Sequence, residues 1–502
     1  MGERKRKGLA CQREVIALDT FGGRIHVEWD PSAAVTPLGQ LPFFIEFLKV
    51  SGLLESWVED CPLSYQSNNA SSKREILATF LLSILAGHQR YAHITALRQD
   101  GIHPELLGVK RLVSEDAARR ALKHMDEAAG IAWLDRHLGK TTQPLLSTPW
   151  ILDLDATVKC LYGKQEGALV GYNAKKPGRP SHGYPSALMA NTRLALRVDV
   201  MAGNETAPSH RMPGIWAWLD RLPKNERPSL LRGDVAYGNE AVLREAEIRH
   251  QPYLNKLKLS AKVKTLIKTL FRQSGWEEAG QGWEGMEDTL TLAGWSCARR
   301  VVVLRRRLAG EMLLTEKEER QGKFAFIEGD APTARYEYAV WVTSTAHPIL
   351  TLAQLYRDRA DSENNFDELK NQGGWGGFTT QDLARCQLMA RRVALVYNGW
   401  TLFVRLAQPH KHFEAISNRP LLLHGVATQT RHAGQTRLTI TRTHAKQAAI
   451  QAVLTNLAAF LASLKATAEQ LTDAQRLRAI LSHAFAKFVL ATSDPPHAFL
   501  GF

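Results

Sequence analysis

Two short apolar segments that each end in an aspartate restrict the fold of this chain more than any other feature. Residues 151–155 read Ile-Leu-Asp-Leu-Asp, and residues 229–234 read Ser-Leu-Leu-Arg-Gly-Asp. Apolar runs this short, next to turn residues, are typical of strands buried in a sheet. In α/β folds, carboxylates at strand ends gather in the crevice at the sheet edge. We therefore expect a sheet that gathers Asp155 and Asp234 at one edge.

The first of these segments carries two aspartates, Asp153 and Asp155. Side chains alternate between the two faces of a strand, so both carboxylates point to the same face. Either one could act as a ligand at the sheet edge, with the other buried against a hydrogen-bond partner. The alternation alone leaves this choice open.

A third candidate carboxylate lies in the segment from Tyr356 to Lys370. We predict one helix here, in which Tyr356, Arg359, Glu363 and Lys370 fall within an arc of roughly 60°. An adjacent face carries the apolar side chains of Leu355, Phe366 and Leu369. The helix is thus expected to pack while it presents Glu363 between cations and a phenol. A solvated face held by ion pairs, such as Arg359 with Glu363, is the alternative.

Asp155, Asp234 and Glu363 form a candidate set of catalytic and metal-binding carboxylates. Phosphoryl transfer from DNA needs such a set, because water or a 3′-hydroxyl must lose a proton while it attacks a charged phosphodiester. Two metal ions held by carboxylates stabilise both the attacking and the leaving oxygen. Hard oxygen ligands favour Mg²⁺, with Mn²⁺ as a substitute. The predicted cofactor is therefore Mg²⁺, bound as two ions.

The same residues resemble those of a known family. The spacing Tyr356-(2)-Arg359-(3)-Glu363-(6)-Lys370 is similar, without a gap, to the Y-(2)-R-(3)-E-(6)-K signature of bacterial insertion-sequence DDE transposases that move by cut and paste. The segments Leu-Asp-Leu-Asp155-Ala-Thr and Leu-Arg-Gly-Asp234-Val-Ala-Tyr-Gly resemble the two aspartate motifs of that family. The first family motif has an aspartate, one further residue and then a threonine, which favours Asp155 over Asp153.

The resemblance covers roughly residues 150–400 and implies an α/β fold. It implies an RNase H-like catalytic core, a mixed sheet with flanking helices, interrupted by a β-rich insertion before the glutamate helix. It implies that Tyr356, Arg359 and Lys370 hold the transposon-end DNA. The implied function is to bind the terminal inverted repeats, cleave both strands and join the 3′ ends to target DNA. The implied partners are double-stranded DNA and, in the synaptic complex, a second copy of the chain.

Relatives in this family can also resolve through a DNA hairpin, with a tryptophan of the insertion stacked on a flipped base. One exposed aromatic face is enough for such a contact. The sequence singles out none of the four tryptophans of the insertion, which are Trp276, Trp283, Trp295 and Trp341.

Changes in composition and in hydrophobic periodicity along the chain predict five regions. We expect an N-terminal DNA-binding region with a hairpin and then helices, followed by a catalytic core that is split by a separate β-rich insertion, and a helical C-terminal region that is a candidate for dimerisation. In order, these regions are residues 1–145, 146–260, 261–350, 351–405 and 406–502. A glycine- and proline-rich excursion is predicted between Gly163 and Pro185.

The charge balance favours a polyanionic partner. Lysine and arginine exceed aspartate and glutamate by 64 to 50, which gives a net charge of +14. The excess is spread along the chain, from the cluster at residues 4–7 to the arginines that flank residues 301–304, so a groove along DNA fits better than one basic tail. Ser114 is predicted to cap a short helix from which Arg119 and Arg120 project as candidate DNA contacts.

Two other readings compete with transposition. The stretch from Leu152 to Thr157 also resembles the D-x-D-x-T loop of haloacid dehalogenase-like phosphatases, in which Asp153 would be a nucleophile and Asp155 a general acid. A DNA-binding relative without catalysis is the other alternative. Against the phosphatase, the stretch lies in mid-chain and leaves the segment from Tyr356 to Lys370 unexplained.

Several further classes are disfavoured. No nucleotide cofactor is expected, because no G-x-x-x-x-G-K-[ST] phosphate loop is present, and no G-x-S-x-G elbow of a serine hydrolase occurs. Five cysteines without C-x-x-C spacing are expected to be reduced. No apolar segment follows the basic start, and the longest apolar stretches are judged too short to span a bilayer. We therefore expect a cytoplasmic protein that associates with the nucleoid when bound to DNA, and no membrane partner.

Overall fold

The computed structural model describes most of the chain. The described residues are 16–27, 34–65, 67, 69–173, 175–308, 336–409, 413–441, 446–466 and 471–486, without the side chains of 361–363. The basic cluster at residues 4–7 and Cys11 lie outside them, and so does the side chain of Glu363. The other four cysteines, Cys61, Cys160, Cys297 and Cys386, are free, as expected.

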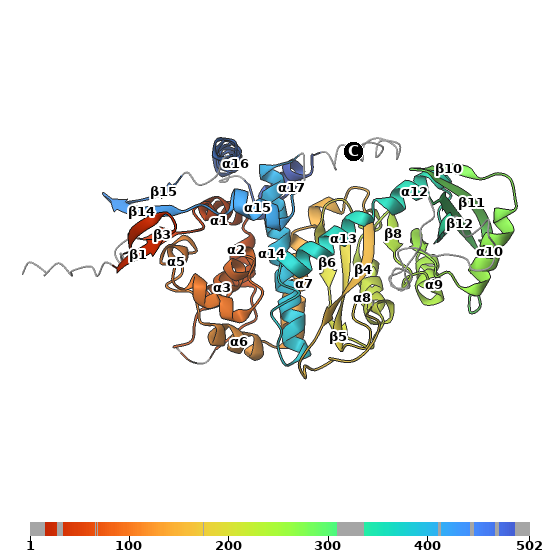
Figure 1. The fold of residues 1–502 in the computed structure, drawn as a ribbon, viewed down its shortest axis with the longest axis horizontal. Helices are drawn as coiled ribbons and strands as arrows, with labels where there is room; N and C mark the ends of the chain where they lie inside the picture. The colour runs from red at the N-terminus through yellow and green to blue at the C-terminus, as the bar shows by residue number, and fades with distance from the viewer. Residues whose placement is uncertain are drawn as a thin grey trace, which may run out of the picture.

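A mixed sheet forms the centre of the fold (Figure 1). Its core strands lie in the order β6–β5–β4–β8–β9, in which β5 runs antiparallel to β4 and β6 while β8 and β9 run parallel to β4. This order and direction make the core RNase H-like, so the predicted α/β fold class is confirmed. The strands are β4 (Ile151–Cys160), β5 (Ser181–Met189), β6 (Leu194–Val198), β8 (Leu230–Gly233) and β9 (Tyr253–Lys256), and the short β7 (Met201–Ala202) pairs with β5.

The strand β5 corrects the predicted excursion, because it already begins at Ser181 and continues through Pro185. All nine of its residues are buried. Pro185 lies where the outer partner of β5 changes, since β6 pairs from Ser186 onward and β7 pairs with residues 182–183. A proline lacks the N–H that a ladder needs, so it is tolerated at such an interruption.

The predicted insertion is part of the same sheet rather than a separate unit. After helix α10 (Ala261–Phe271), four strands form an antiparallel meander, and its last strand pairs with β9 through Trp341 with Lys256 and Val342 with Asn255. The core sheet therefore continues into this region without a break. The strands are β10 (Glu277–Gly280), β11 (Trp283–Leu290), β12 (Arg299–Arg307) and β13 (Tyr336–Thr343).

The segment that carries the signature residues folds as more than one helix, contrary to the prediction. Helix α12 (Ile349–Arg357) ends in a turn at residues 358–359, and α13 (Ala360–Asp367) follows it. A wider π-helical turn, η5 (Glu368–Gln372), follows α13 and contains Lys370. α12 lies against β10 and β11, and α13 lies across β4 (Figure 1). An arc computed at 3.6 residues per turn cannot hold through a π turn, because the helical period changes there.

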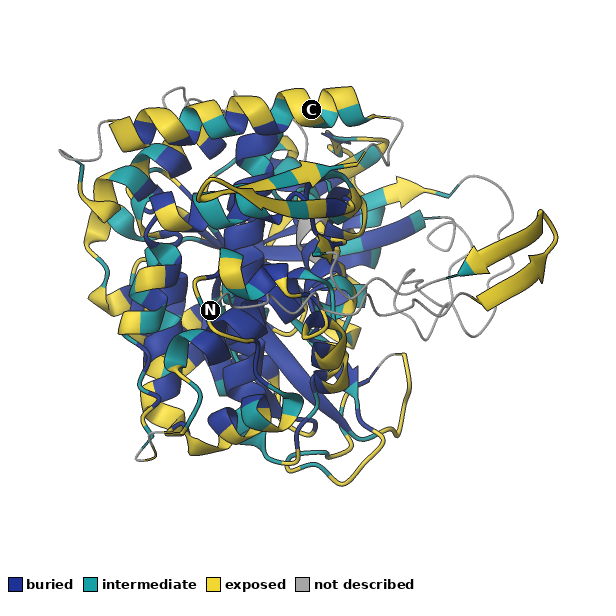
Figure 2. Ribbon diagram, turned by 90° about the vertical axis from the view of Figure 1, so that its left-hand side faces the viewer, coloured by how far each residue is buried: buried dark blue, intermediate teal, exposed yellow. Residues whose placement is uncertain are grey.

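Long helix α14 (Leu383–Ala407) joins the core to the helical regions at both ends of the chain. It packs on β6 and contacts α3, α7, α16 and α17. Figure 2 shows buried residues concentrated in the interior and exposed residues on the outer faces of the helices. The helices before the core are α1 (Leu41–Val50), α2 (Leu53–Glu59), α3 (Lys73–Leu85), α4 (Ile94–Leu97), α5 (Ile102–Leu106), α6 (Glu115–His124) and α7 (Glu127–Lys140), and short 3₁₀ turns are η1 (Tyr91–His93), η2 (Gln143–Leu145) and η3 (Lys224–Glu226).

The remaining elements complete the layers around α14 and the sheet. Helix α8 packs on β5, and a three-stranded sheet joins the two ends of the chain, since β14 pairs with β3. The hairpin β1–β2 pairs with no other described strand, and its residues are exposed apart from Val27. The bounds are α8 (Ala207–Arg221), α9 (Glu240–Ile248), α15 (Ala415–Leu422), α16 (Gln447–Ala466), α17 (Asp473–Ala484), β1 (Ile16–Thr20), β2 (Gly23–Val27), β3 (Val35–Thr36), β14 (Ala427–His432) and β15 (Gln435–Ile440).

Helix α16 is long and apolar enough to cross a membrane by length and composition, with a mean hydropathy of 1.4. The expectation that all apolar stretches are too short therefore fails for this helix. A single such helix is weak evidence, because helices of soluble proteins pass the same test. Its buried leucines recur at helical spacing and pack toward α1 and α14, as expected for an amphipathic helix on a protein core. These leucines are Leu454, Leu457, Leu461 and Leu464.

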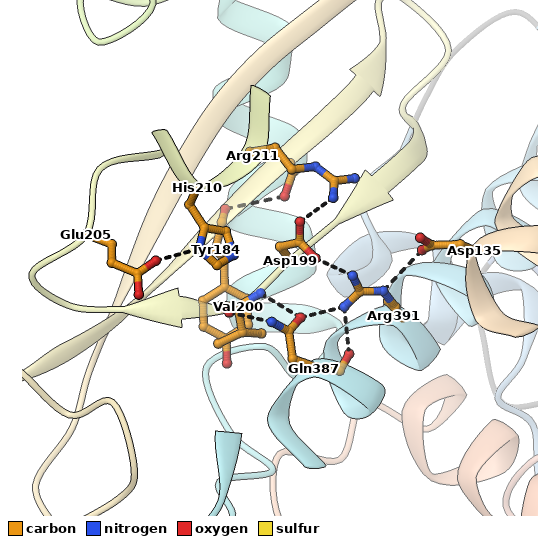
Figure 3. Close-up of polar contacts among 10 residues, drawn as sticks. Asp135, Tyr184, Asp199, Val200, Glu205, His210, Arg211, Gln387 and Arg391 are labelled. Carbon is orange, nitrogen blue, oxygen red and sulfur yellow. Dashed lines mark hydrogen bonds and ion pairs between the residues drawn. The ribbon is translucent and has the colours of Figure 1, made fainter. Parts of the chain in front are cut away.

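A buried polar network fastens α14 to the core sheet (Figure 3). Arg391 on α14 contacts Asp199, which follows β6, and places its Nε 3.1 Å from Asp135 on α7. Arg211 on α8 contacts the other oxygen of Asp199. Burial raises the pKa of Asp199, but the two guanidinium groups outweigh burial, so this pKa lies below its ordinary value of 3.8. One carboxylate thus joins two helices to the end of a core strand.

We predict that Asp199→Asn lowers the free energy of unfolding by about 3 kcal/mol at pH 7, because it removes the charge that the two buried guanidinium groups of Arg211 and Arg391 share. Urea denaturation measures this loss. Because the folded pKa is depressed, the contribution is complete above pH 3.8 and disappears as the pH falls through the folded value. The difference between wild type and variant should therefore shrink below about pH 4.

The matched control is Glu205→Gln, which removes the partly exposed ion pair with His210 shown in Figure 3. An exposed pair of this kind contributes about 1 kcal/mol or less. Equal losses in the two variants would contradict the proposed role of Asp199.

Candidate catalytic site

The parallel ladder between β4 and β8 places Asp155 and Asp234 beside each other, although only β8 ends here and β4 continues past Asp155 to Cys160, contrary to the prediction. Leu154 on β4 pairs with Gly233 on β8 in a parallel register, and each aspartate is the next residue along its strand. Because side chains alternate, the two carboxylates project from the same face of the sheet. Asp155 is 13% exposed in its side chain, and Asp234 is half-buried. The structure therefore brings these two predicted residues together beside the end of β8.

Both carboxylates are oriented by the backbone that follows them. The N–H of Ala156 donates to Oδ1 of Asp155 at 2.7 Å, and the N–H of Ala236 donates to Oδ1 of Asp234 at 3.0 Å. The guanidinium of Arg359 contacts the other oxygen of Asp155. Although burial lowers the pKa of Arg359, the nearby carboxylates of Asp155 and Asp234 raise it above its ordinary value. Arg359 therefore lies in the field of both aspartates.

Asp153 occupies a different environment from Asp155. Its carboxylate accepts two hydrogen bonds from Arg232 on β8, from Nε at 2.5 Å and from Nη2 at 2.6 Å, and both side chains are only 1% exposed. Arg232 also donates to the carbonyl of Leu355 in α12. Asp153 thus holds two strands and a helix together behind the crevice. A phosphatase nucleophile must reach its substrate, so the burial of Asp153 contradicts the phosphatase hypothesis.

The described signature side chains all reach toward β4 or β8. The hydroxyl of Tyr356 donates to the carbonyl of Gly233 at 3.4 Å, and Nζ of Lys370 donates to the carbonyl of Val158. Burial raises the pKa of Tyr356 and lowers the pKa of Lys370. The backbone of Glu363 lies in α13 between these contacts, while its side chain is outside the described residues. The signature residues therefore cover the sheet edge instead of forming an open solvated face.

The donor set fits a hard divalent cation. Asp155 and Asp234 offer carboxylate oxygens on one face of the sheet, and such oxygens are what Mg²⁺ and Mn²⁺ prefer. Among the described side chains no group of three or more histidine, cysteine, aspartate or glutamate residues could hold a metal ion. A third carboxylate from α13 would have to complete the set.

A buried glutamate that the sequence did not single out fixes the end of the signature segment. Glu368 is 1% exposed and accepts hydrogen bonds from Arg193 at 3.1 Å, from the hydroxyl of Tyr397 at 2.9 Å and from the N–H of Ala415 at 2.7 Å. It begins the π turn, and π turns inside helices are frequent at functional sites. Glu368 therefore ties the helix that carries Glu363 to α14 and α15.

Lys159 is a second charged residue that the sequence did not single out. It is buried near the end of β4, and its Nζ donates to the carbonyl of Gly377. Burial lowers the pKa of Lys159 to about 8. A lysine inside a strand was the available signal, but lysines in that position more often point to solvent.

Each tryptophan of the insertion already has a stacking partner. Trp341 is stacked on Tyr356 with ring centroids 4.8 Å apart, and an arginine lies over each of the other three rings. The pairs are Arg305 over Trp276 at 3.8 Å, Arg306 over Trp283 at 5.0 Å and Arg299 over Trp295 at 4.9 Å. The structure therefore does not select one of them as a contact for a flipped base.

A basic groove lies in the N-terminal helical region. Ser114 caps α6 by accepting the N–H of Ala117, as predicted. Arg119 projects from this helix and lies over the ring of Tyr91 at 4.7 Å. Arg120 instead lines a groove of about 280 Å³ with the cationic side chains of Arg98 and Arg111, and with His124. The two arginines predicted as DNA contacts therefore occupy different surroundings.

Comparison with known proteins gives one family match. A family model described as a transposase DDE domain, group 1, matches residues 48–462. No curated protein matches the chain. Among solved structures, a piggyBac transposase in a synaptic complex with hairpin DNA is similar with a TM-score of 0.36 and 10% identity, over 89% of this chain and 85% of that chain. A similarity at that level supports no conclusion about this chain.

We predict that Glu368→Gln loosens the signature helix, because it removes the charge that Arg193 and Tyr397 contact. Amide hydrogen exchange across residues 360–372 should become faster, and the free energy of unfolding should fall by about 3 kcal/mol. Asp367→Asn is the matched control, since Asp367 is the exposed neighbour and accepts from Asn371 at the surface. Unchanged exchange in Glu368→Gln would refute the anchoring role.

Proposed function

Since the chain belongs to the family defined by the transposase DDE domain, group 1, we propose that it is a DNA transposase of an insertion sequence. It would bind the terminal inverted repeats, cleave the strands at the element ends and join the 3′ ends to target DNA. One observation carries the proposal. Asp155 and Asp234 lie on one face of the adjacent strands β4 and β8 of an RNase H-like core, beside the turn that bears Arg359 and the helix α13 that bears Glu363.

The cleavage that frees a 3′ end is a displacement at phosphorus. The oxygen of a water molecule forms a bond to phosphorus while the bond between phosphorus and the 3′ oxygen breaks. The water loses a proton and the leaving oxygen gains one, which yields a 3′-hydroxyl and a 5′-phosphate. Joining repeats the displacement with the 3′-hydroxyl as nucleophile and a phosphodiester of target DNA as substrate. Both steps use one arrangement of groups around the phosphate.

We assign the metal to Asp155, Asp234 and Glu363. Divalent ions, two of Mg²⁺ or its substitute Mn²⁺, would supply stabilisation of the attacking and leaving oxygens when bound there. The hydrogen bonds from Ala156 and Ala236 fix the rotamers of the two aspartates before any ligand arrives. Arg359 contacts the second oxygen of Asp155 and holds that carboxylate in place.

Tyr356, Arg359 and Lys370 are proposed to hold the transposon-end DNA beside this site. The ammonium of Lys370 has three N–H donors, of which the carbonyl of Val158 uses one. A phosphate can therefore bind to Lys370 without breaking the existing contact. The remaining parts of the proposal are double-stranded DNA as partner, a homodimer in the synaptic complex through the C-terminal helices, and action in the cytoplasm on the nucleoid.

We predict that Asp234→Asn and Glu363→Gln each abolish Mg²⁺-dependent cleavage of a duplex with the element's terminal repeat, while DNA binding persists. Each amide keeps the shape of the side chain but loses the charge that holds a metal ion. Gel assays of cleavage and of binding separate the two effects. Cleavage that survives in both variants would show that the carboxylate assignment is wrong, and wild-type binding without cleavage would favour a non-catalytic relative.

We predict that Arg120→Ala weakens DNA binding and lowers the slope of log affinity against log salt by about 1, because one phosphate contact is lost. Arg119→Ala is the matched control on the same helix, and its effect should be smaller because Arg119 lies over Tyr91. Salt titrations of binding compare the two variants. Equal slopes for Arg120→Ala and wild type would exclude the groove as part of the DNA path.

A further inference from the structure

The register of the sheet places a lysine beside the two catalytic candidates. Gly233 on β8 pairs with Asn255 on β9 in a parallel register, so Lys256 is the neighbour of Asp234 one row further on. Alternation of side chains sets Lys256 on the face from which Asp155 and Asp234 project. Across three adjacent strands, the row at the sheet edge therefore carries two carboxylates and then an ammonium.

The insertion supplies the next member of this row. Lys256 pairs with Trp341 on β13, and paired residues of an antiparallel ladder project to the same face. Trp341 in turn stacks on Tyr356 of the signature. Lys256 thus lies between the carboxylate edge on one side and the stacked rings of Trp341 and Tyr356 on the other.

A groove opens at this position. Its volume is about 420 Å³, and it is lined by Lys256, Lys258, Trp341, Tyr356 and, directly after Asp234, by Val235. Lys256 is only partly buried, so its side chain can reach a ligand in the groove. Glu337 also lines the groove, but its carboxylate is paired with Arg306 at 2.5 Å. The groove is therefore a recess lined mainly by apolar and aromatic side chains, with the cationic groups of Lys256, Lys258 and Arg357 on its wall.

We propose that Lys256 is a further catalytic residue that binds a non-bridging oxygen of the DNA phosphate under attack. The assignment rests on the proposed function. Three carboxylates repel a phosphodiester, and the displacement at phosphorus concentrates charge on the non-bridging oxygens. An ammonium is a compact charge with three donors, which suits a phosphate oxygen whose position shifts during the reaction. Lys256 supplies this charge on the side of Asp234 that faces the groove.

Lys258 serves as the internal comparison. It lines the same groove and carries the same charge, but it lies two residues beyond the end of β9 and is exposed. Replacement of either lysine by methionine removes one charge and keeps an apolar stem of similar length. The variants Lys256→Met and Lys258→Met therefore change the net charge of the groove equally, and only the first removes the charge beside Asp234.

The first measurement is single-turnover cleavage of the terminal-repeat duplex in Mg²⁺ by the full-length chain. Lys256→Met should slow cleavage by about 100-fold, whereas Lys258→Met should slow it much less. Lys256→Arg keeps the charge and should retain more cleavage than Lys256→Met. Thermal unfolding of each variant reports whether the fold is intact, and Lys256→Gln, which also removes the charge, replaces Lys256→Met in both measurements if the methionine variant does not fold.

The second measurement is binding in metal-free buffer to two duplexes, one natural and one with an uncharged methylphosphonate at the cleaved position. Wild type should bind the natural duplex about tenfold more tightly. Lys256→Met should lose this preference, and Lys258→Met should keep it. This comparison reports a contact with the phosphate charge without relying on catalysis.

The outcomes separate the two levels of the proposal. Wild-type cleavage together with undiminished cleavage by Lys256→Met overturns the assignment of Lys256 and leaves the transposase proposal intact. Equal losses in the two methionine variants, or an unchanged preference between the duplexes in Lys256→Met, also overturn it. A wild-type chain that cleaves no terminal-repeat DNA refutes the proposed function and with it the role of Lys256.

Discussion

The buried ion pair between Asp153 and Arg232 is the interaction on which the rest of the site depends. It joins β4 to β8, and the same guanidinium reaches the carbonyl of Leu355 in α12. Both charges are almost completely removed from solvent, so the loss of one partner would cost about 3–5 kcal/mol. The pair thus links β4 to β8 and also fixes the position of α12 relative to these two strands. Asp155 and Asp234 then lie two residues further along, where β8 ends while β4 continues beside β5.

This arrangement explains why two similar aspartates on one strand have different environments. Asp153 and Asp155 share a face, but the first lies opposite Arg232 within the ladder and the second lies beyond the last paired residue of β8. A fully paired, enclosed carboxylate stabilises the fold, whereas a partly exposed one can accept a ligand. Arg359 then takes the place next to Asp155 that Arg232 takes next to Asp153. The same combination of acid and arginine is thus used once for structure and once at the edge of the crevice.

The sequence correctly predicted those structural elements that are specified by residues close together in the chain. The apolar runs before Asp155 and Asp234 predicted two strands, Ser114 predicted a helix cap, and the RNase H-like fold class is confirmed. The roles of Asp155, Asp234 and Glu363 remain predictions. Three features were out of reach, because each depends on partners distant in the chain: the passage of β5 through Pro185, the π turn at Glu368, and the pairing of β13 with β9. A local pattern specifies that a strand forms, but the partner of that strand is decided by packing.

Because β13 pairs with β9, the insertion is positioned by the core sheet and not by a linker. A separate β-rich unit would be an appendage, and its tryptophans would be placed near the crevice only by a flexible connection. The pairing of Trp341 with Lys256 and of Val342 with Asn255, on the strand that follows Asp234, instead makes the insertion a continuation of the sheet. One row of side chains then runs from Asp155 through Asp234 and Lys256 to Trp341. Because a sheet transmits position through its ladder, the distance between the carboxylates and the groove is fixed by the fold itself, and a shift of β13 by one residue would turn Lys256 toward a different neighbour.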